Sequence, residues 1–195
     1  MKRAAGAATL VLFSSGAQAH IVIPGVGGFE GGLLHPFFVL THALALIALG
    51  LLAGMQTWRQ RLAMLAVFAA AMVAAFGLVS LAYATDRSEL AVLALTAIAG
   101  LVLSVRPNVP VAVAAVLAAL VGAGILLDSV PAVPTVRETI IALAGTLLAA
   151  TAIIALVAFA SAVLPAFWPR IGVRVAGSWI AASAILVLAL RLAKL

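Results

Sequence analysis

The sequence contains no cysteine, and this absence excludes disulfide bonds, thiolate metal sites, iron–sulfur clusters and cysteine nucleophiles. Charged residues are also scarce, because Asp, Glu, Lys and Arg make up only 8% of the 195 residues. A soluble domain carries about 25% charged residues, so this chain could not cover a water-facing surface. Apolar residues account for 67% of the chain, and the composition therefore indicates an integral membrane protein.

The sequence also lacks common catalytic motifs, since it has no phosphate-binding loop, no HExxH run and no nucleophile–base–acid set. We therefore expect neither an enzyme nor an organic cofactor. The net charge of +6 could suggest a nucleic-acid partner, but no basic face with interleaved aromatic residues occurs. Most of the arginines fall instead in short loops between apolar runs, as the positive-inside rule for membrane proteins describes.

The first 19 residues have the pattern of a cleaved signal peptide. Lys2 and Arg3 form a positively charged start. The apolar run that follows is shorter than the roughly 20 residues that a span needs. Ala17-Gln-Ala19 then has the small residues that a signal peptidase accepts. An uncleaved anchor helix is the alternative.

Cleavage after residue 19 would leave residues 20–195 as a single transmembrane helical domain that begins at His20. A free α-amine beside an imidazole is a compact bidentate nitrogen donor for divalent copper or nickel. The new N-terminus would therefore be a candidate metal ligand outside the cytoplasm.

The rest of the chain predicts an all-α, polytopic membrane helix bundle of about six transmembrane helices. The expected spans are the long apolar runs at 33–55, 62–85, 89–105, 109–127, 138–164 and 171–192. The loops between them are too short to fold as soluble domains. The run Gly50-Leu-Leu-Ala-Gly54 is a GxxxG pair, and we interpret it as a sign of close packing within the bundle rather than of a dimer.

Loop charge predicts the orientation in a bacterial inner membrane. If His20 lies outside the cytoplasm, the first span delivers Arg59 and Arg61 to the inside, as the positive-inside rule requires. An even number of spans places Arg191 and Lys194 outside. Five spans with a re-entrant segment would move this basic tail inside, and that alternative stays open.

The approach to the first span is rich in glycine, which predicts an irregular loop that folds back over a site. His35 precedes Pro36, so we expect His35 at the helix cap and Pro36 at the first helical position. His42 lies close to two full turns further on, on the same face, but about 10 Å away along the axis of a straight helix. One metal ion could not bridge that separation. Either the helix start is unwound, or an ion would contact the two histidines one after the other on its way into the membrane.

The candidate metal donors are imidazoles and one carboxylate: His20, Glu30, His35 and His42. In the functional hypothesis they form an outward-facing site or entry path for a divalent transition metal. Such donors suit nickel, cobalt, copper or zinc, and the order of affinities alone favours copper. In the structural alternative the histidines cap a helix or bond to a neighbouring helix, and the carboxylate is solvated. We prefer the functional hypothesis because ionisable residues inside a membrane are functional by default.

Asp128 and Glu138 flank a proline-containing outer loop. We expect both carboxylates to be solvated rather than part of a site.

The run His35-Pro-Phe-Phe-Val-Leu-Thr-His42 resembles the motif H-P-x-x-G-x-D-H of the HupE/UreJ family of nickel/cobalt permease-type membrane proteins. As in that family, a signal peptide and a glycine-rich stretch precede the run, and an apolar helix follows it. The resemblance implies a permease-like protein that moves nickel or cobalt across the inner membrane. It also implies metalloenzyme-maturation proteins as partners, while the oligomeric state stays open.

The run departs from the family motif at two positions. Val39 replaces the glycine, and Thr41 replaces the aspartate, so a hydroxyl stands where a carboxylate is expected. No histidine follows His42 in the chain, whereas members of the family usually carry further histidines in later helices. A second hypothesis is therefore a non-transporting accessory or assembly subunit of a membrane or metalloenzyme complex.

Overall fold

The computed structural model describes residues 28–79, 88–105, 109–131, 135–163 and 168–193. All regular structure within these ranges is helical, which confirms the expected all-α class. The helices are α2 (Gly28–Phe38), α3 (Leu40–Gly54), α4 (Trp58–Val79), α5 (Ser88–Val105), α6 (Val111–Asp128), α7 (Val136–Ala162) and α8 (Trp168–Leu192). The predicted signal peptide and His20 lie outside the described residues.

Helices α4 to α8 are each long and apolar enough to cross a membrane. α2 and α3 meet that criterion only as a pair, and the pair is bent by 72° at Val39. The described part of the chain therefore has five spans, or six if the bent pair counts as one broken span. This agrees with the predicted polytopic bundle and leaves both predicted span counts open.

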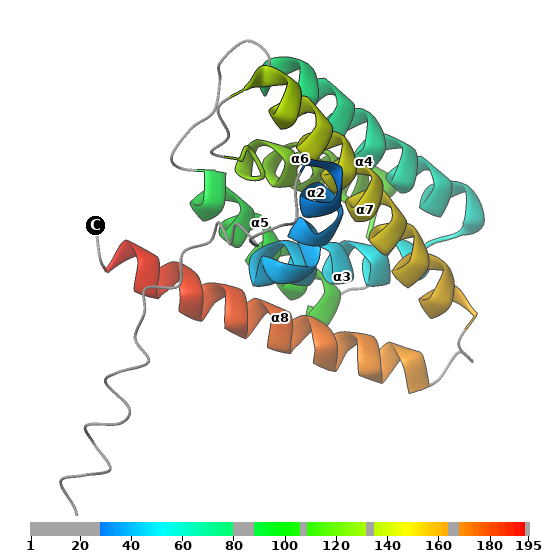
Figure 1. Ribbon diagram of the computed structural model, residues 1–195. Coiled ribbons are helices and arrows are strands. Elements are labelled where there is room, and N and C mark those ends of the chain that lie inside the picture. Colours follow the sequence, from blue (N-terminus) through cyan, green and yellow to red (C-terminus); the bar gives the residue numbers. More distant parts are fainter. Residues whose placement is uncertain (1–27, 80–87, 106–108, 132–134, 164–167, 194–195) are drawn as a thin grey trace, which may run out of the picture.

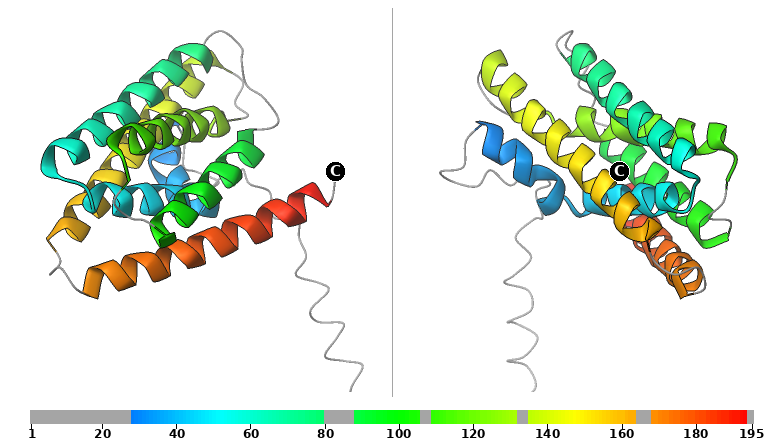
Figure 2. Two further views of the ribbon diagram at one scale, coloured as in Figure 1. Left: turned by 180° about the vertical axis from the view of Figure 1, so that it is seen from behind. Right: turned by 90° about the vertical axis from the view of Figure 1, so that its right-hand side faces the viewer.

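α3 is the central helix of the bundle and contacts every other described helix (Figure 1). α5 and α8 lie side by side on one flank and run antiparallel (Figure 2). Arg191 at the end of α8 pairs with Glu89 at the start of α5 at 2.8 Å. At the opposite end, Arg174 Nε donates to the Ser104 carbonyl at 2.7 Å. Polar contacts thus fix both ends of this helix pair.

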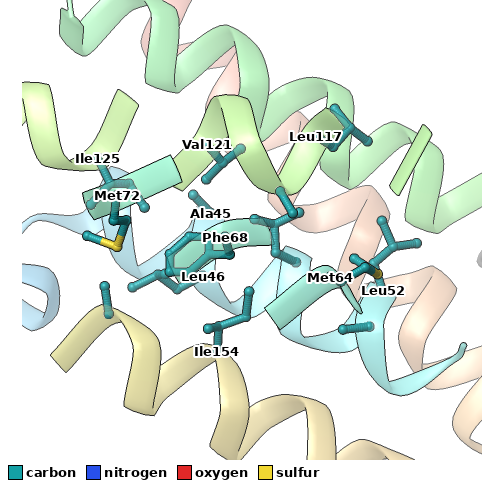
Figure 3. Close-up of a cluster of buried hydrophobic side chains, with 14 of the residues drawn as sticks. Ala45, Leu46, Leu52, Met64, Phe68, Met72, Leu117, Val121, Ile125 and Ile154 are labelled. Atoms are coloured by element: carbon teal, nitrogen blue, oxygen red, sulfur yellow. The ribbon is translucent and has the colours of Figure 1, made fainter. Parts of the chain in front are cut away.

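Buried side chains hold the middle of α3 against its neighbours. One apolar cluster draws on the six helices from α3 to α8, with Leu46, Phe68, Val121 and Ile154 among its members (Figure 3). Lipid tails are about as apolar as these side chains, so their stabilising effect comes mainly from dispersion contacts in a close-packed interior. The shape of the cluster therefore fixes where α3 lies.

Glycines allow both halves of the broken span to lie directly against α7. A Cβ at Gly32 would overlap the Ala142 carbonyl oxygen, and one at Gly50 would lie 2.6 Å from the Val157 Cβ. Gly54 approaches α7 equally closely. The GxxxG pair therefore packs against a helix of its own chain, as predicted, and brings two backbones together where no hydrophobic effect drives association.

The first span begins earlier than predicted and is interrupted. α2 is helical from Gly28, Pro36 lies inside it, and His35 is in its last turn. The prediction that His35 caps the helix and that Pro36 opens it was therefore wrong. The glycine-rich approach is also helical from Gly28 onward rather than irregular, because Gly32 lets α2 pack closely on α7.

Pro36 has no backbone N–H, so the carbonyl of Gly32, four residues earlier, loses its helical donor. Thr146 of α7 is buried, and its hydroxyl donates to this carbonyl at 3.1 Å. The same hydroxyl lies 3.3 Å from the Ala142 carbonyl of its own helix. Backbone groups in a bilayer must be satisfied within the protein. Thr146 therefore stabilises a helix that the proline weakens.

Replacing Thr146 with valine should lower the free energy of unfolding by about 1 kcal/mol, because the Gly32 carbonyl loses its donor. In a Pro36→Ala background the loss should shrink by at least half, since residue 36 then offers an amide N–H. The measurement is unfolding of the detergent-solubilised protein, followed by tryptophan fluorescence. Thr96→Val is the matched control, because the Thr96 hydroxyl bonds only to a carbonyl of its own helix. Equal losses in both backgrounds would contradict the assignment.

The contact between α2 and α7 predicts opposite effects for two glycine-to-alanine changes. Gly32→Ala should lower the free energy of unfolding by about 1–3 kcal/mol, because its Cβ meets backbone that cannot yield easily. Gly172→Ala should be neutral or stabilising by up to about 1 kcal/mol, because nothing lies near its Cβ and alanine favours helix. The same unfolding assay compares them. A neutral Gly32→Ala would mean that the helices can move apart without loss.

Candidate metal-binding site at the broken span

The bend at Val39 directs the first turn of α3 into the bundle. His42 lies in this turn, and its side chain is completely buried. Its Nε2 atom is 2.9 Å from Oδ2 of Asp128, which is the last residue of α6. A buried polar or charged side chain needs a hydrogen-bonded partner, and each of these two residues provides one for the other.

Asp128 also contacts a third helix. Ser88, the first residue of α5, donates its hydroxyl proton to Asp128 Oδ1 at 2.8 Å. The Asp128 side chain is only 10% exposed, so the prediction that it is solvated was wrong. The loop position of Asp128 in the sequence does not reveal this, because the direction of its side chain depends on how α6 packs beside α3 and α5.

Helix dipoles help to explain why a carboxylate is tolerated here. Asp128 lies at the C-terminus of its own helix, where the partial negative charge disfavours an acid. However, its two partners, His42 and Ser88, lie in the first turns of α3 and α5. The N-termini of those helices carry partial positive charge that favours an anion. The α3 N-terminus has no side-chain cap, because Val39 occupies the capping position.

His35 approaches His42 from the other side of the break. The ring centroids of the two histidines are 5.2 Å apart, and their planes are inclined by 56°. In a straight helix the two residues would be about 10 Å apart along the axis. The structure has neither an unwound helix start nor a straight helix: helix lies on both sides of a bend at Val39, and this bend brings the two imidazoles into contact.

The hydrogen bond to Asp128 constrains the protonation of the His42 ring. An ionised carboxylate only accepts hydrogen bonds, so we assign the proton to Nε2. The other ring nitrogen, Nδ1, is buried and has no hydrogen-bond partner among the described residues. In the neutral ring this nitrogen carries a lone pair. His42 can therefore offer Nδ1 to a ligand while Asp128 holds the opposite side of the ring.

The remaining predicted donors lie elsewhere. Glu30 is exposed in the first turn of α2, and His20 lies outside the described residues. Within the described ranges, no three side chains among His, Asp and Glu converge as a set that could hold a metal ion. The structure thus brings together two of the four predicted donors, His35 and His42, and adds Asp128 as a partner of His42.

The arrangement has the chemistry of a weak site for a transition-metal ion. Imidazole suits nickel, cobalt, copper and zinc. A metal-binding histidine usually donates its other N–H to a carboxylate or carbonyl, which fixes the ring and its tautomer. His42 and Asp128 have this relation. One helix ends and another begins at this break, and helix-end backbone groups coordinate ions in transporters with interrupted helices.

At the opposite end of α3, a cationic side chain of the protein itself caps the helix. The Arg61 guanidinium donates to the carbonyls of Ala53, Gly54 and Gln56 at 3.1–3.3 Å. These carbonyls lie at the C-terminus of α3, where partial negative charge favours a cation. The central helix is therefore anchored at both ends, by Asp128 at its start and by Arg61 at its end.

Comparison with known proteins identifies the family of this chain. Searches of curated proteins and of solved structures found no match. The family model described as HupE / UreJ protein matches residues 8–187, which is most of the chain. The match includes the broken span with His35 and His42, the residues that carry the sequence resemblance. The chain therefore belongs to the HupE/UreJ family.

Proposed function

We propose that this protein is a permease-like component of the bacterial inner membrane that binds and moves a divalent transition-metal ion. Nickel or cobalt is the cargo that the family suggests. The observation that carries the proposal is the contact of two imidazoles at a break in the first span, His35 and His42, with the Nδ1 atom of His42 not engaged by any described residue.

The location of these groups supports the proposal. Ionisable side chains within spans are rare and typically mark a substrate or ion path. Interrupted helices bind ions near the bilayer midplane in many transporters. A helix break and an ionisable pair at the same point therefore favour a transport function over a purely structural one.

The small number of donors also fits a passage site. An ion must bind strongly enough to enter a path and weakly enough to leave it. Two imidazoles hold an ion more weakly than the four protein ligands of a structural zinc site. His35 and His42 thus suit transient binding, and His20 and Glu30 could add donors nearer the entrance.

The charge distribution supports entry from outside the cytoplasm. Arg59 and Arg61 follow α3 at the end opposite to His42. If the positive-inside rule holds for this loop, His42 lies toward the outer face and the mature N-terminus is outside. The ion would then reach the histidines first and pass the Arg61 end last.

A second candidate is an accessory subunit that does not transport. Two observations favour it. The described residues contain no three-donor metal group, and His42 has a structural partner in Asp128. In that case the histidines would stabilise the bundle, and the protein would act by packing against a larger complex.

Metal uptake separates the two candidates. Cells without their own nickel and cobalt importers are given the wild-type protein or variants, and accumulated nickel and cobalt are measured. His35→Asn and His42→Asn should each lower uptake about tenfold or more, since even lost outer-shell contacts typically weaken metal sites 10- to 100-fold. Glu138→Gln is the control, because this exposed carboxylate lies at the start of α7 and is not one of the predicted metal donors.

The amount of each variant in the membrane must be measured in the same cells, so that loss of protein is not mistaken for loss of transport. Uptake equal to that of empty cells for the wild-type protein would refute the permease. Unchanged uptake in both histidine variants would exclude a path through these residues.

A further inference from the structure

We propose that Asp128 and Ser88 form a positioning pair that fixes the tautomer of His42, so that Nδ1 is the atom that binds the metal. This inference rests on the proposed function, since it specifies how the same site is prepared. Neither residue contacts the ion in this proposal. Both act through His42, from helices far along the chain from α3.

The two oxygens of Asp128 have separate partners. Oδ1 accepts from the Ser88 hydroxyl at 2.8 Å, and Oδ2 lies 2.9 Å from His42 Nε2. The Ser88 bond therefore sets the rotation of the carboxylate and aims Oδ2 at the imidazole. Since the carboxylate must accept, Nε2 carries the ring proton and Nδ1 keeps its lone pair.

Because His42 is buried, its tautomer decides whether the ring can bind a metal through Nδ1. Its side chain is completely buried, so bulk water does not reach the ring to assist exchange between tautomers. A ring with its proton on Nδ1 would have no lone pair there and could not bind a metal through that atom. The carboxylate thus decides whether the buried histidine can serve as a ligand.

Asp128→Asn tests the tautomer assignment, because it changes the hydrogen-bonding groups of the side chain with almost no change in the shape of that side chain. The Ser88 hydroxyl should still donate to the amide oxygen, which leaves the amide NH₂ group facing His42. That group can only donate, so Nε2 must become the acceptor and the ring proton must move to Nδ1. A comparable aspartate-to-asparagine change leaves the geometry of a serine-protease triad intact but imposes the wrong histidine tautomer.

The double variant Ser88→Ala/Asp128→Asn should restore part of the original His42 tautomer. Without the serine hydroxyl, that donor no longer holds the amide oxygen away from His42, so the oxygen can turn toward the imidazole and the original tautomer becomes accessible again. A merely structural role would predict the opposite, because removing two hydrogen-bonding groups should harm the protein more than removing one. Ser178→Ala is the matched serine control, since its hydroxyl bonds only within α8.

The first readout is nitrogen NMR of protein labelled at the histidine rings, recorded in detergent without metal. The chain has only three histidines, so single His→Gln variants assign the signals. We expect the Nε2–H tautomer of His42 in the wild-type protein, the Nδ1–H tautomer in Asp128→Asn, and partial return in the double variant. An Nδ1–H wild-type ring, or an unchanged ring in Asp128→Asn, would overturn the proposal.

The second readout is the affinity of the same proteins for cobalt and nickel salts, measured by titration. Asp128→Asn should bind about 10- to 100-fold more weakly, and the double variant should recover part of the loss. If Asp128→Asn does not accumulate, the wild-type tautomer still tests the assignment. Reversal of the tautomer with undiminished affinity would refute the link to metal binding. A wild-type protein with the expected tautomer but no metal affinity would instead refute the proposed function.

Discussion

The site depends on one backbone constraint, the missing N–H of Pro36 inside a membrane helix. A carbonyl in lipid cannot turn to water for a donor, and Thr146 supplies that donor from α7. With this bond in place, α2 remains helical through the proline and ends at Phe38, and the chain then bends by 72° at Val39. The bend brings His35 and His42 into contact and directs the start of α3 toward Asp128. A continuous helix would have kept the two rings about two turns apart.

The break also creates the electrostatic setting of the site. A continuous span has no helix N-terminus in its middle, whereas the broken span has one at Leu40. Its partial positive charge and that of the α5 start compensate a carboxylate that its own helix disfavours. Arg61 provides the reciprocal arrangement at the other end of α3, where a cation meets terminal carbonyls. The central helix therefore has an anion at its start and a cation at its end, which suits the direction of its dipole and opposes sliding along its axis.

The sequence predicted the membrane class, the approximate spans and the packing of the GxxxG pair within the bundle. These features depend on composition and local spacing, which a single sequence carries directly. The position of Pro36 within a helix was predicted wrongly, because Pro36 needs the hydroxyl of Thr146, which comes from a helix more than a hundred residues away. The role of Asp128 was missed for the same reason. An acid at the end of an apolar run indicates only that a span ends there, and the packing of α6 beside α3 decides whether it faces water or a histidine.

The carboxylate beside His42 comes from another helix, so its position depends on how the helices pack. In the motif that the His35 segment resembles, the aspartate precedes the second histidine on the same helix, and here Thr41 occupies that position. Asp128 brings a carboxylate to the same histidine from α6 instead. A carboxylate adjacent in sequence stays near its histidine whatever the other helices do, but one on α6 stays there only while α6 is packed in place. Gly122 allows that packing, since a Cβ there would lie 2.8 Å from the Phe68 carbonyl oxygen of α4. The state of the His42 ring is therefore a property of the assembled bundle, and helix contacts far from the histidines become determinants of the site.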